Sequence, residues 1–210
     1  MFVDRVRVKV KSGNGGNGCC SFRREAFVPR GGPNGGDGGN GGNIYFRASA
    51  RLTTLVDMRY HPNWAGKRGM HGQGKNCTGR NGEDLYLEVP VGTVVQDYET
   101  GEVCADLTED GQEFLAARGG QGGRGNARFV TSTNRIPRFA EKGEPGEEKE
   151  YILELKLIAE AGLVGLPNAG KSTFLTVVSA ARPKIGDYPF TTLSPNLGVA
   201  LLSDHRMLTI

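Results

Sequence analysis

Gly31-Gly-Pro-Asn-Gly-Gly-Asp-Gly-Gly-Asn-Gly-Gly42 carries glycine at nearly every third position. Two shorter runs over residues 13–18 and 119–125 share this spacing, and a looser set lies within residues 66–72. A period of three fits neither a helix nor a strand. It is the period of polyproline II, in which glycine on one edge lets neighbouring backbones approach closely. The runs are too short and too poor in proline for collagen. We therefore predict several short polyproline II helices, packed side by side and paired through backbone groups.

The segments between the glycine runs alternate like strands. Valines alternate with Lys and Arg within residues 5–11, which predicts a strand with one face in water. Residues 43–47 and 84–95 have a similar β character, and Asp110-Gly111 is a hairpin signal. A flexible linker is the alternative for the glycine runs, but they interrupt strand-like segments at several places. We therefore predict a β-rich domain with glycine-rich projections over residues 1–158.

The charges are segregated along the chain. The 210 residues include 33 glycines and carry a formal net charge of only +3. Residues 1–80 nevertheless carry a net charge of +10, and residues 81–113 carry a net charge of −10. These blocks predict a basic face and an acidic face on the first domain, with blocks that interleave and cancel in space as the alternative.

Composition excludes several classes of protein. No apolar stretch approaches the roughly 18 residues of a membrane span, and the N-terminus lacks the apolar region of a signal peptide. The four cysteines are too few for a disulfide scaffold and have no Cys-x-x-Cys zinc spacing. We therefore expect a reduced, soluble, cytoplasmic protein that has no membrane span and is a monomer.

A phosphate-loop motif stands near the end of the chain. Residues 165–172 match G-x-x-x-x-G-K-[ST] at every fixed position. A strand candidate over residues 151–164, which we expect to enter a different and more buried sheet, precedes them, and a helix candidate over residues 171–181 follows them. Such a loop points backbone N–H groups at a phosphate, and the helix N-terminus adds partial positive charge. The lysine reaches the β- and γ-phosphates, and the serine hydroxyl binds Mg²⁺. The predicted nucleotide-binding residues are Gly165, Leu166, Pro167, Asn168, Ala169, Gly170, Lys171 and Ser172.

A loop candidate over residues 182–194 follows the helix candidate. It contains two prolines, a glycine and the pair Thr191-Thr192, about 20 residues behind the phosphate loop. A threonine on such a loop can bind Mg²⁺ and sense the γ-phosphate, so the pair supports a nucleotide-sensing segment. Two further strand candidates, residues 198–202 and 206–210, come next.

Both parts of the sequence resemble one family. Residues 165–173 with Asp187-Tyr-Pro-Phe-Thr-Thr192, and residues 17–24 with residues 31–39, resemble the bacterial Obg (CgtA) GTPases of the OBG-HflX-like superfamily. The resemblance covers essentially the whole chain. It implies an N-terminal Obg fold, a small β-barrel that carries a bundle of glycine-rich polyproline II helices. It also implies the start of a Ras-like α/β P-loop G domain over residues 159–210.

The resemblance also implies an activity and partners. GTP and GDP would be the ligands and Mg²⁺ a cofactor, with slow GTP hydrolysis acting as a switch in late assembly of the large (50S) ribosomal subunit. The rRNA and proteins of that subunit would be the partners, with links to stress response and cell-cycle control. One alternative is a P-loop kinase or ATPase. Another is a P-loop NTPase whose β-rich domain is a protein-interaction scaffold rather than an RNA-binding module.

Single residues take roles from the resemblance. Ser172 and Thr192 would be ligands of Mg²⁺. Asn168 stands where some related GTPases hold an activating K⁺, with a loop-shaping asparagine as the alternative. The switch segment that contacts the nucleotide would be Phe190, Thr191, Thr192, Leu193 and Ser194. No catalytic residue is assigned.

Two motifs of the family do not occur in the sequence. They are Asp-x-x-Gly and Asn-Lys-x-Asp, and the second of these selects guanine in the family. Guanine specificity therefore rests on the resemblance alone. We expect these 210 residues to be a fragment of the whole protein that is inactive in hydrolysis by itself.

Basic residues stand beside the glycine-rich turns of the first domain. Projections with guanidinium tips could contact RNA phosphates and stack on unpaired bases, whereas a solvated basic surface is the alternative. The predicted RNA-facing residues are Arg23, Arg24, Arg30, Lys67, Arg68, Lys75, Arg80, Arg124, Arg128, Arg135 and Arg138.

Overall fold

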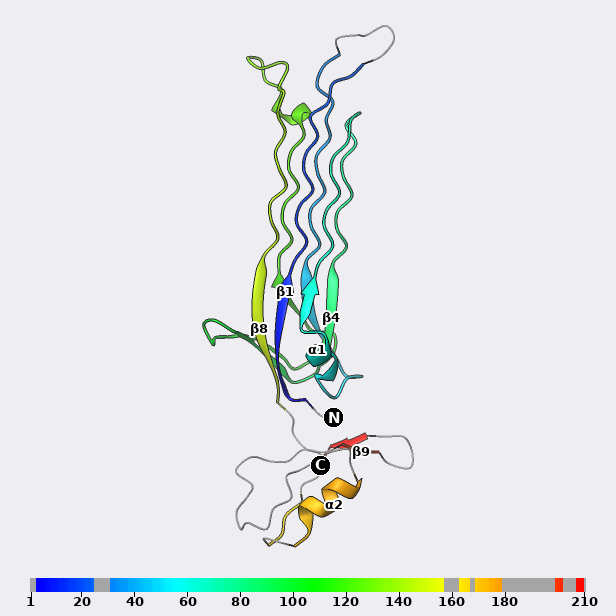
Figure 1. Ribbon diagram of the computed structural model, residues 1–210, viewed down its shortest axis with the longest axis vertical. Coiled ribbons are helices and arrows are strands. Elements are labelled where there is room, and N and C mark those ends of the chain that lie inside the picture. The colour runs from blue at the N-terminus through cyan, green and yellow to red at the C-terminus, as the bar shows by residue number, and fades with distance from the viewer. Residues whose placement is uncertain are drawn as a thin grey trace.

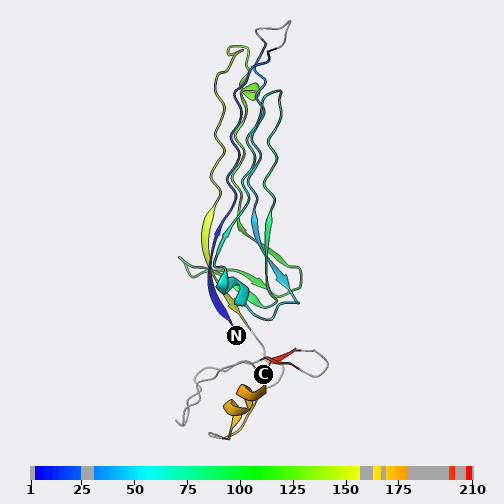
Figure 2. The ribbon, with the colours of Figure 1, turned by 45° about the vertical axis from the view of Figure 1, so that its right-hand side comes forward.

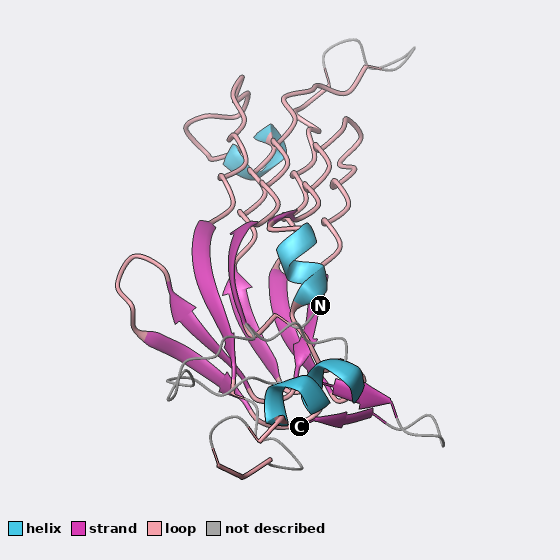
Figure 3. Cartoon of the chain, turned by 60° about the horizontal axis from the view of Figure 1, so that its bottom comes forward, coloured by secondary structure: helices cyan, strands magenta, loops and turns pink. Residues whose placement is uncertain are grey.

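A computed structural model describes residues 3–24, 31–156, 163–166, 169–178, 199–201 and 207–209. The part through residue 156 is an elongated body in which strands gather at one end and long arms extend from the other (Figure 1). This part is rich in β-structure and has few helices, as predicted. Figure 3, which brings the strand end forward, shows the arms continuing from the strands as loops.

Eight strands form two sheets in the described part of this body. The five-stranded sheet has the order β3-β1-β8-β5-β6 and the three-stranded sheet the order β4-β2-β7. The strands are β1 (Arg5–Lys11), β2 (Ile44–Ser49), β3 (Asn63–Ala65), β4 (Leu85–Pro90), β5 (Thr93–Asp97), β6 (Val103–Leu107), β7 (Glu113–Ala117) and β8 (Glu148–Leu155). The helices are α1 (Val56–Tyr60) and a 3₁₀ helix, η1 (Asn126–Phe129).

The two sheets enclose one apolar core. Alternate residues of a strand face opposite sides, so Val8 and Val10 of β1 are fully buried while Arg7 and Lys9, which alternate with them, face water. Phe46 of β2 packs edge-on against Tyr151 of β8, with 5.7 Å between ring centroids. The Tyr151 hydroxyl donates a hydrogen bond to the Ala116 carbonyl at 2.7 Å, which satisfies the polar end of the ring inside the core. Burial raises the pKa of Tyr151.

The Asp110-Gly111 hairpin prediction is wrong. These residues lie between β6 and β7, which belong to different sheets, so the turn carries the chain from one sheet to the other. Gly111 has a φ of 78°, which explains the glycine but does not determine which strands pair. The hairpin in this region joins β5 to β6 and uses Gly101, with a φ of 72°.

The strand predicted over residues 151–164 is only partly correct. β8 ends at Leu155 and pairs with β1 and β5, so it lies between them in the five-stranded sheet rather than entering a different sheet. Residues 163 and 164 are not in a strand, and residues 157–162 lie outside the described residues.

Within the described residues, six extended arms run side by side beyond the strands (Figure 2). They are residues 12–21, 34–43, 66–73, 77–84, 118–126 and 137–147. Their backbones pair at every third residue: the N–H groups of Gly13, Gly16 and Cys19 donate to the carbonyls of Gly42, Gly39 and Gly36. The pairing through backbone groups and its three-residue spacing agree with the sequence prediction.

Glycine recurs in the arms because the neighbouring backbones leave no room for a Cβ atom. A Cβ built on Gly41 would lie 1.8 Å from the Gly13 carbonyl oxygen, and one on Gly38 would lie 1.9 Å from the Gly16 carbonyl oxygen. Backbone atoms cannot move aside in the way that a flexible side chain can. In the arm over residues 34–43, Gly35, Gly38 and Gly41, spaced three apart, are therefore restricted to glycine by close approach.

Asparagine and aspartate side chains join the arms where backbone carbonyls do not. The Gly143 N–H donates to Asn17 Oδ1 at 3.0 Å, and the Gly122 N–H donates to Asn40 Oδ1 at 2.9 Å. The bundle thus combines backbone bonds with side-chain bonds from the residues between the glycines. This arrangement satisfies polar backbone groups in arms that are not assigned to a sheet.

Beyond residue 156 the structure describes three short elements. These are α2 (Lys171–Val178), β9 (Val199–Leu201) and β10 (Met207–Thr209). β9 and β10 pair antiparallel, which confirms the two strand candidates predicted there. α2 confirms a helix directly after the phosphate loop, and residues 179–181 of the predicted helix lie outside the described residues.

Candidate nucleotide-binding loop and basic tips

The phosphate-loop motif runs into the first turn of α2. Gly170 has a φ of 81°, a left-handed conformation that glycine adopts without a Cβ penalty, and the Phe174 N–H donates to the Gly170 carbonyl at 2.9 Å. The first N–H groups of a helix have no acceptor within the helix and carry the positive end of its dipole. The end of the loop therefore has the local geometry that suits an anion.

Lys171 folds back over the loop. Its ammonium group donates to the carbonyls of Gly165 and Leu166, at 2.7 Å each. The loop carbonyls thus hold the cation beside the start of α2, where a phosphate group would meet both the ammonium and the helix N-terminus. This combination fits the phosphate groups of a nucleotide.

Several predicted site residues lie outside the described part. They are Pro167, Asn168 and the predicted switch segment from Phe190 to Ser194, which includes Thr192. The structure describes Gly165, Leu166, Ala169, Gly170 and Lys171, and it places Ser172 in the first turn of α2. Among the described residues, no group of three His, Cys, Asp or Glu side chains could hold a metal ion.

A second candidate site lies at the far ends of the arms. Asn126 joins three segments at this level: its Oδ1 accepts the Gly35 N–H at 2.8 Å, and its Nδ2 donates to the carbonyls of Ser21 and Pro137 at 3.0 and 3.2 Å. The turn that contains Asn76 lies at the same end of the arms, because the Asn76 N–H donates a hydrogen bond to the Asn34 carbonyl at 2.7 Å. The turns beyond these contacts form the tips of the body.

The tips combine cationic and apolar groups. Phe129 and Phe139 pack together with 4.8 Å between ring centroids, and the Arg124 guanidinium lies 5.1 Å from the centre of the Phe129 ring. Ile136 and Phe139 expose 61% and 52% of their surface, although both are apolar. Such a surface can contact phosphates through its cations and unpaired bases through its rings.

The predicted RNA-facing residues differ in their pairing. Arg124 bonds to Glu141 at 2.7 Å, and Arg128 bonds to Asp37 at 2.6 Å. Lys67 pairs with Glu83, and Arg80 lies 4.0 Å from the same carboxylate. Arg30 lies outside the described residues, and Arg23 does make interactions. The remaining members make no ion pair in the described part of the chain: Arg24, Arg68, Lys75, Arg135 and Arg138.

Two family models match the chain. A family model described as GTP1/OBG matches residues 3–157. The chain belongs to the GTP1/OBG family. A second model, described as 50S ribosome-binding GTPase, matches residues 160–210, which include the phosphate loop.

Curated relatives in the GTP1/OBG family carry the name GTPase Obg. One from Moorella thermoacetica is 65% identical over 204 residues, 97% of this chain and 48% of the relative. One from Prosthecochloris aestuarii is 59% identical over 205 residues, 98% of this chain and 63% of the relative. One from Heliobacterium modesticaldum is 62% identical over 206 residues, 98% of this chain and 47% of the relative. The chain thus spans about half to three fifths of the length of these relatives.

Asn126, which joins three segments at the tips, was not predicted from the sequence. Asn126 is fully buried, yet it follows the run Gly119-Gly-Gln-Gly-Gly-Arg-Gly125 like any other polar residue in a glycine-rich arm. Nothing local distinguishes it from the exposed Asn81. Its role depends on segments near residues 21, 35 and 137, which only the fold brings together.

The helices in the described part of the chain are all too short or too polar to span a membrane.

Proposed function

We propose that this chain is part of a cytoplasmic GTP-binding protein that hydrolyses GTP slowly and acts as a switch in late assembly of the large ribosomal subunit. The observation that carries the proposal is a phosphate loop at the start of α2 in a chain of the GTP1/OBG family. The description 50S ribosome-binding GTPase for residues 160–210 and the relatives' name GTPase Obg support GTP and the large subunit. The proposal extends to links with stress response and cell-cycle control and to a monomeric state.

The nucleotide site in this proposal comprises Gly165 to Ser172 and Phe190 to Ser194. Ser172 and Thr192 would hold Mg²⁺, which neutralises charge on the β- and γ-phosphates when it is bound. Lys171 supports this assignment because its ammonium already lies against the loop that would surround the phosphates. Asn168 would help to hold an activating K⁺.

Nucleotide binding is tested with a fluorescent GTP analogue and the full-length protein. We expect unlabelled GTP, and not ATP, to displace the analogue. Lys171→Ala should weaken binding at least tenfold, since charge-assisted bonds to phosphate contribute about 1.5–3 kcal/mol each. Lys142→Ala, at an exposed lysine of the arms, is the matched control. Displacement by ATP as well would support the kinase or ATPase alternative.

The K⁺ assignment has its own test. If Asn168 helps to hold an activating K⁺, the full-length protein should hydrolyse GTP faster in KCl than in NaCl at the same ionic strength. Equal rates in the two salts would leave Asn168 as a residue that only shapes the loop.

The partner in this proposal is RNA of the large subunit, contacted through the tips of the arms. Arg135 and Arg138, which make no ion pair within the described residues, and the exposed Phe139 support contacts with both phosphates and bases. Arg124 and Arg128 are better assigned to holding the arms together through Glu141 and Asp37. Among the predicted RNA-facing residues, we therefore propose Arg135 and Arg138 as contacts with RNA, and Arg124 and Arg128 as residues that hold the arms together.

Three structural assignments also stay proposals. The boundary between the domains lies near residues 158 and 159, supported by family matches that end at 157 and begin at 160. The arms are polyproline II helices, supported by pairing at every third residue. The two sheets form a small barrel, supported by their shared core. Raman optical activity, which distinguishes polyproline II from strands, tests the second assignment.

A further inference from the structure

Positive and negative charges lie at opposite ends of the body formed by residues 3–156. The arms and tips, residues 12–43, 66–83 and 118–147, contain thirteen Lys and Arg against six Asp and Glu. The strand end, comprising the remaining residues, contains nine Lys and Arg against fourteen Asp and Glu. The near-neutral total therefore hides one end with a net charge of +7 and another with a net charge of −5. The alternative of interleaved blocks that cancel does not describe this body.

The acidic excess of the strand end is concentrated in β5, β6 and their turns. These elements lie in the segment from residue 81 to residue 113. That segment carries carboxylates and no Lys or Arg. Asp106 pairs with Lys156 at 3.2 Å, and Glu113 pairs with Arg47 at 2.6 Å. Four further carboxylates are exposed and make no ion pair in the described part of the chain. They are Glu99 and Glu102, before β6, and Glu109 and Asp110, after it; we call these four residues the acidic face.

The two ends do not neutralise each other. The arm from Gly13 to Ser21 has nine residues, which span about 28 Å at about 3.1 Å per residue in an extended chain. The Debye length is about 8 Å at physiological ionic strength. A polyanion at the tips is therefore screened from the acidic face, and a polyanion at the strand end meets that face directly.

We propose that the acidic face prevents RNA from binding in the wrong orientation. Its negative charge repels RNA from the strand end, so that RNA approaches this body only through the tips. The inference rests on the proposed contact between the tips and RNA. Like-charge juxtaposition at an interface suppresses wrong partners and wrong registers, and charged surfaces change local counter-ion concentrations by about 10–10³-fold. The strand end also carries the exposed basic residues Arg51 and Arg59, so an RNA could bind there in the absence of the acidic face.

Two exposed native cysteines allow a direct test. Cys77 lies in the turn at the tip of one arm, and Cys104 lies in β6 beside the acidic face. Full-chain variants that keep only one of them, with the other three cysteines changed to serine, receive a benzophenone cross-linker. A labelled RNA hairpin of about 30 nucleotides is the probe. We expect cross-linking from Cys77 to exceed that from Cys104 by roughly tenfold.

The acidic face is then neutralised in the Cys104 background. Glu99→Gln, Glu102→Gln, Glu109→Gln and Asp110→Asn together keep the size of each side chain, and the amide oxygen introduced at position 110 can still accept the Ala50 N–H. We expect the Cys104 yield to rise roughly tenfold at low salt, with no rise at about 1 M salt, where the Debye length is about 3 Å. Circular dichroism confirms that the variant is folded.

The outcomes separate this inference from the proposed function. RNA that cross-links from Cys77, with a Cys104 yield unchanged by neutralisation, would overturn the acidic face and leave the tip contact standing. Equal yields from both cysteines in the protein with its native charges would overturn the single orientation. No cross-link from either cysteine in any variant would contradict both proposals. A rise at Cys104 that persists at about 1 M salt would contradict the electrostatic cause.

Discussion

At the scale of the residue, the arms depend on glycine at positions where a neighbouring carbonyl occupies the place of a Cβ atom. Gly41 is such a position, since its Cβ would lie 1.8 Å from the Gly13 oxygen. We predict that Gly41→Ala lowers the free energy of unfolding by at least about 1–3 kcal/mol, the usual cost of overpacking. Urea denaturation measures this change.

Gly32 provides the matched control for this prediction. A Cβ atom on Gly32 would meet nothing within 4 Å, and its φ does not lie in the left-handed range. Gly32→Ala should therefore change the free energy of unfolding by less than about 1 kcal/mol. Equal losses for the two substitutions would show that close packing of the arms is not the cause.

Asn126 is predicted to hold the tips in place. Asn126→Ala leaves the Gly35 N–H and the Pro137 carbonyl without their partner in a buried environment. Each unsatisfied buried group costs about 1–3 kcal/mol, so we expect a loss of at least about 2 kcal/mol in urea denaturation. Asn81→Ala is the control because Asn81 is exposed, and water can replace its bond to the Asn40 N–H. A smaller loss for Asn126→Ala than for Asn81→Ala would refute this role.

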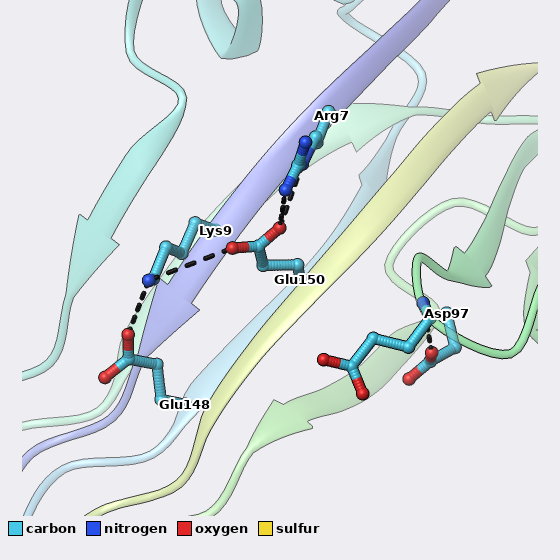
Figure 4. A network of polar contacts seen from close by, with 6 residues as sticks. Arg7, Lys9, Asp97, Glu148 and Glu150 are labelled. Atoms are coloured by element: carbon cyan, nitrogen blue, oxygen red, sulfur yellow. Dashed lines mark hydrogen bonds and ion pairs between the residues drawn. The ribbon is translucent and has the colours of Figure 1, made fainter.

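At the scale of the element, β1 and β8 are joined by alternating charges on their exposed face (Figure 4). Arg7 pairs with Glu150, and Lys9 reaches both Glu150 at 3.8 Å and Glu148 at 2.6 Å. Lys11 adds a bond to Glu148 at 2.9 Å. Hydrogen bonds from Lys9 and Lys11 lower the pKa of Glu148 to about 2.

This depressed pKa predicts how stability depends on pH. The pKa of Glu148 is lower in the folded chain than the ordinary 4.5, so its contribution is present above about pH 4.5. The contribution is lost as the pH falls from about 4.5 to about 2, since the folded state then binds the proton as well. The difference in urea midpoint between the parent protein and Glu148→Gln should therefore shrink over this range.

Glu154→Gln serves as the control for the pH series. Glu154 lies on the same strand but makes no ion pair within the described residues. Its substitution should leave the difference from the parent protein nearly constant as the pH falls through the same range. A constant difference for Glu148→Gln instead would mean that the lysines do not stabilise its carboxylate.

The elements also show what the sequence could and could not predict. Alternation identified β1, and glycine spacing identified the paired arms, because both are local patterns that the fold preserves. The turn at Asp110-Gly111 was recognised, but its strands pair elsewhere, since a turn signal does not specify partners. β8 was assigned to the wrong sheet because its partner β1 is more than 140 residues away in the sequence.

The sequence predicted the phosphate loop better than the tips, because a local pattern can be recognised in a sequence and contacts between distant segments cannot. The phosphate loop is a contiguous motif, so the sequence located it, and α2 begins where the motif requires. The tips are assembled from three distant segments, so the sequence could neither find Asn126 nor separate paired from unpaired arginines. Ion pairs such as Arg128 with Asp37 join residues about ninety positions apart.

At the scale of the whole molecule, the free positive charge at the tips predicts the salt dependence of RNA binding. Arg135→Ala with Arg138→Ala removes from one tip two exposed cations that make no ion pair with any described residue. The slope of log affinity against log salt should become shallower by about 1.4–1.8, as each phosphate contact contributes about 0.7–0.9. Arg51→Ala with Arg59→Ala, at the strand end, should leave the slope unchanged. Equal effects of the two pairs in filter binding would contradict contact through the tips.

The phosphate loop and the tips belong to one protein, and we propose that nucleotide state controls binding of the tips to the large ribosomal subunit. Co-sedimentation of the full-length protein with purified 50S and 30S subunits tests it most directly. We predict binding to 50S that strengthens with a non-hydrolysable GTP analogue, does not strengthen with the ATP analogue, and weakens in Arg135→Ala with Arg138→Ala. Binding to neither subunit in any nucleotide state would contradict the claim and favour a protein-interaction scaffold.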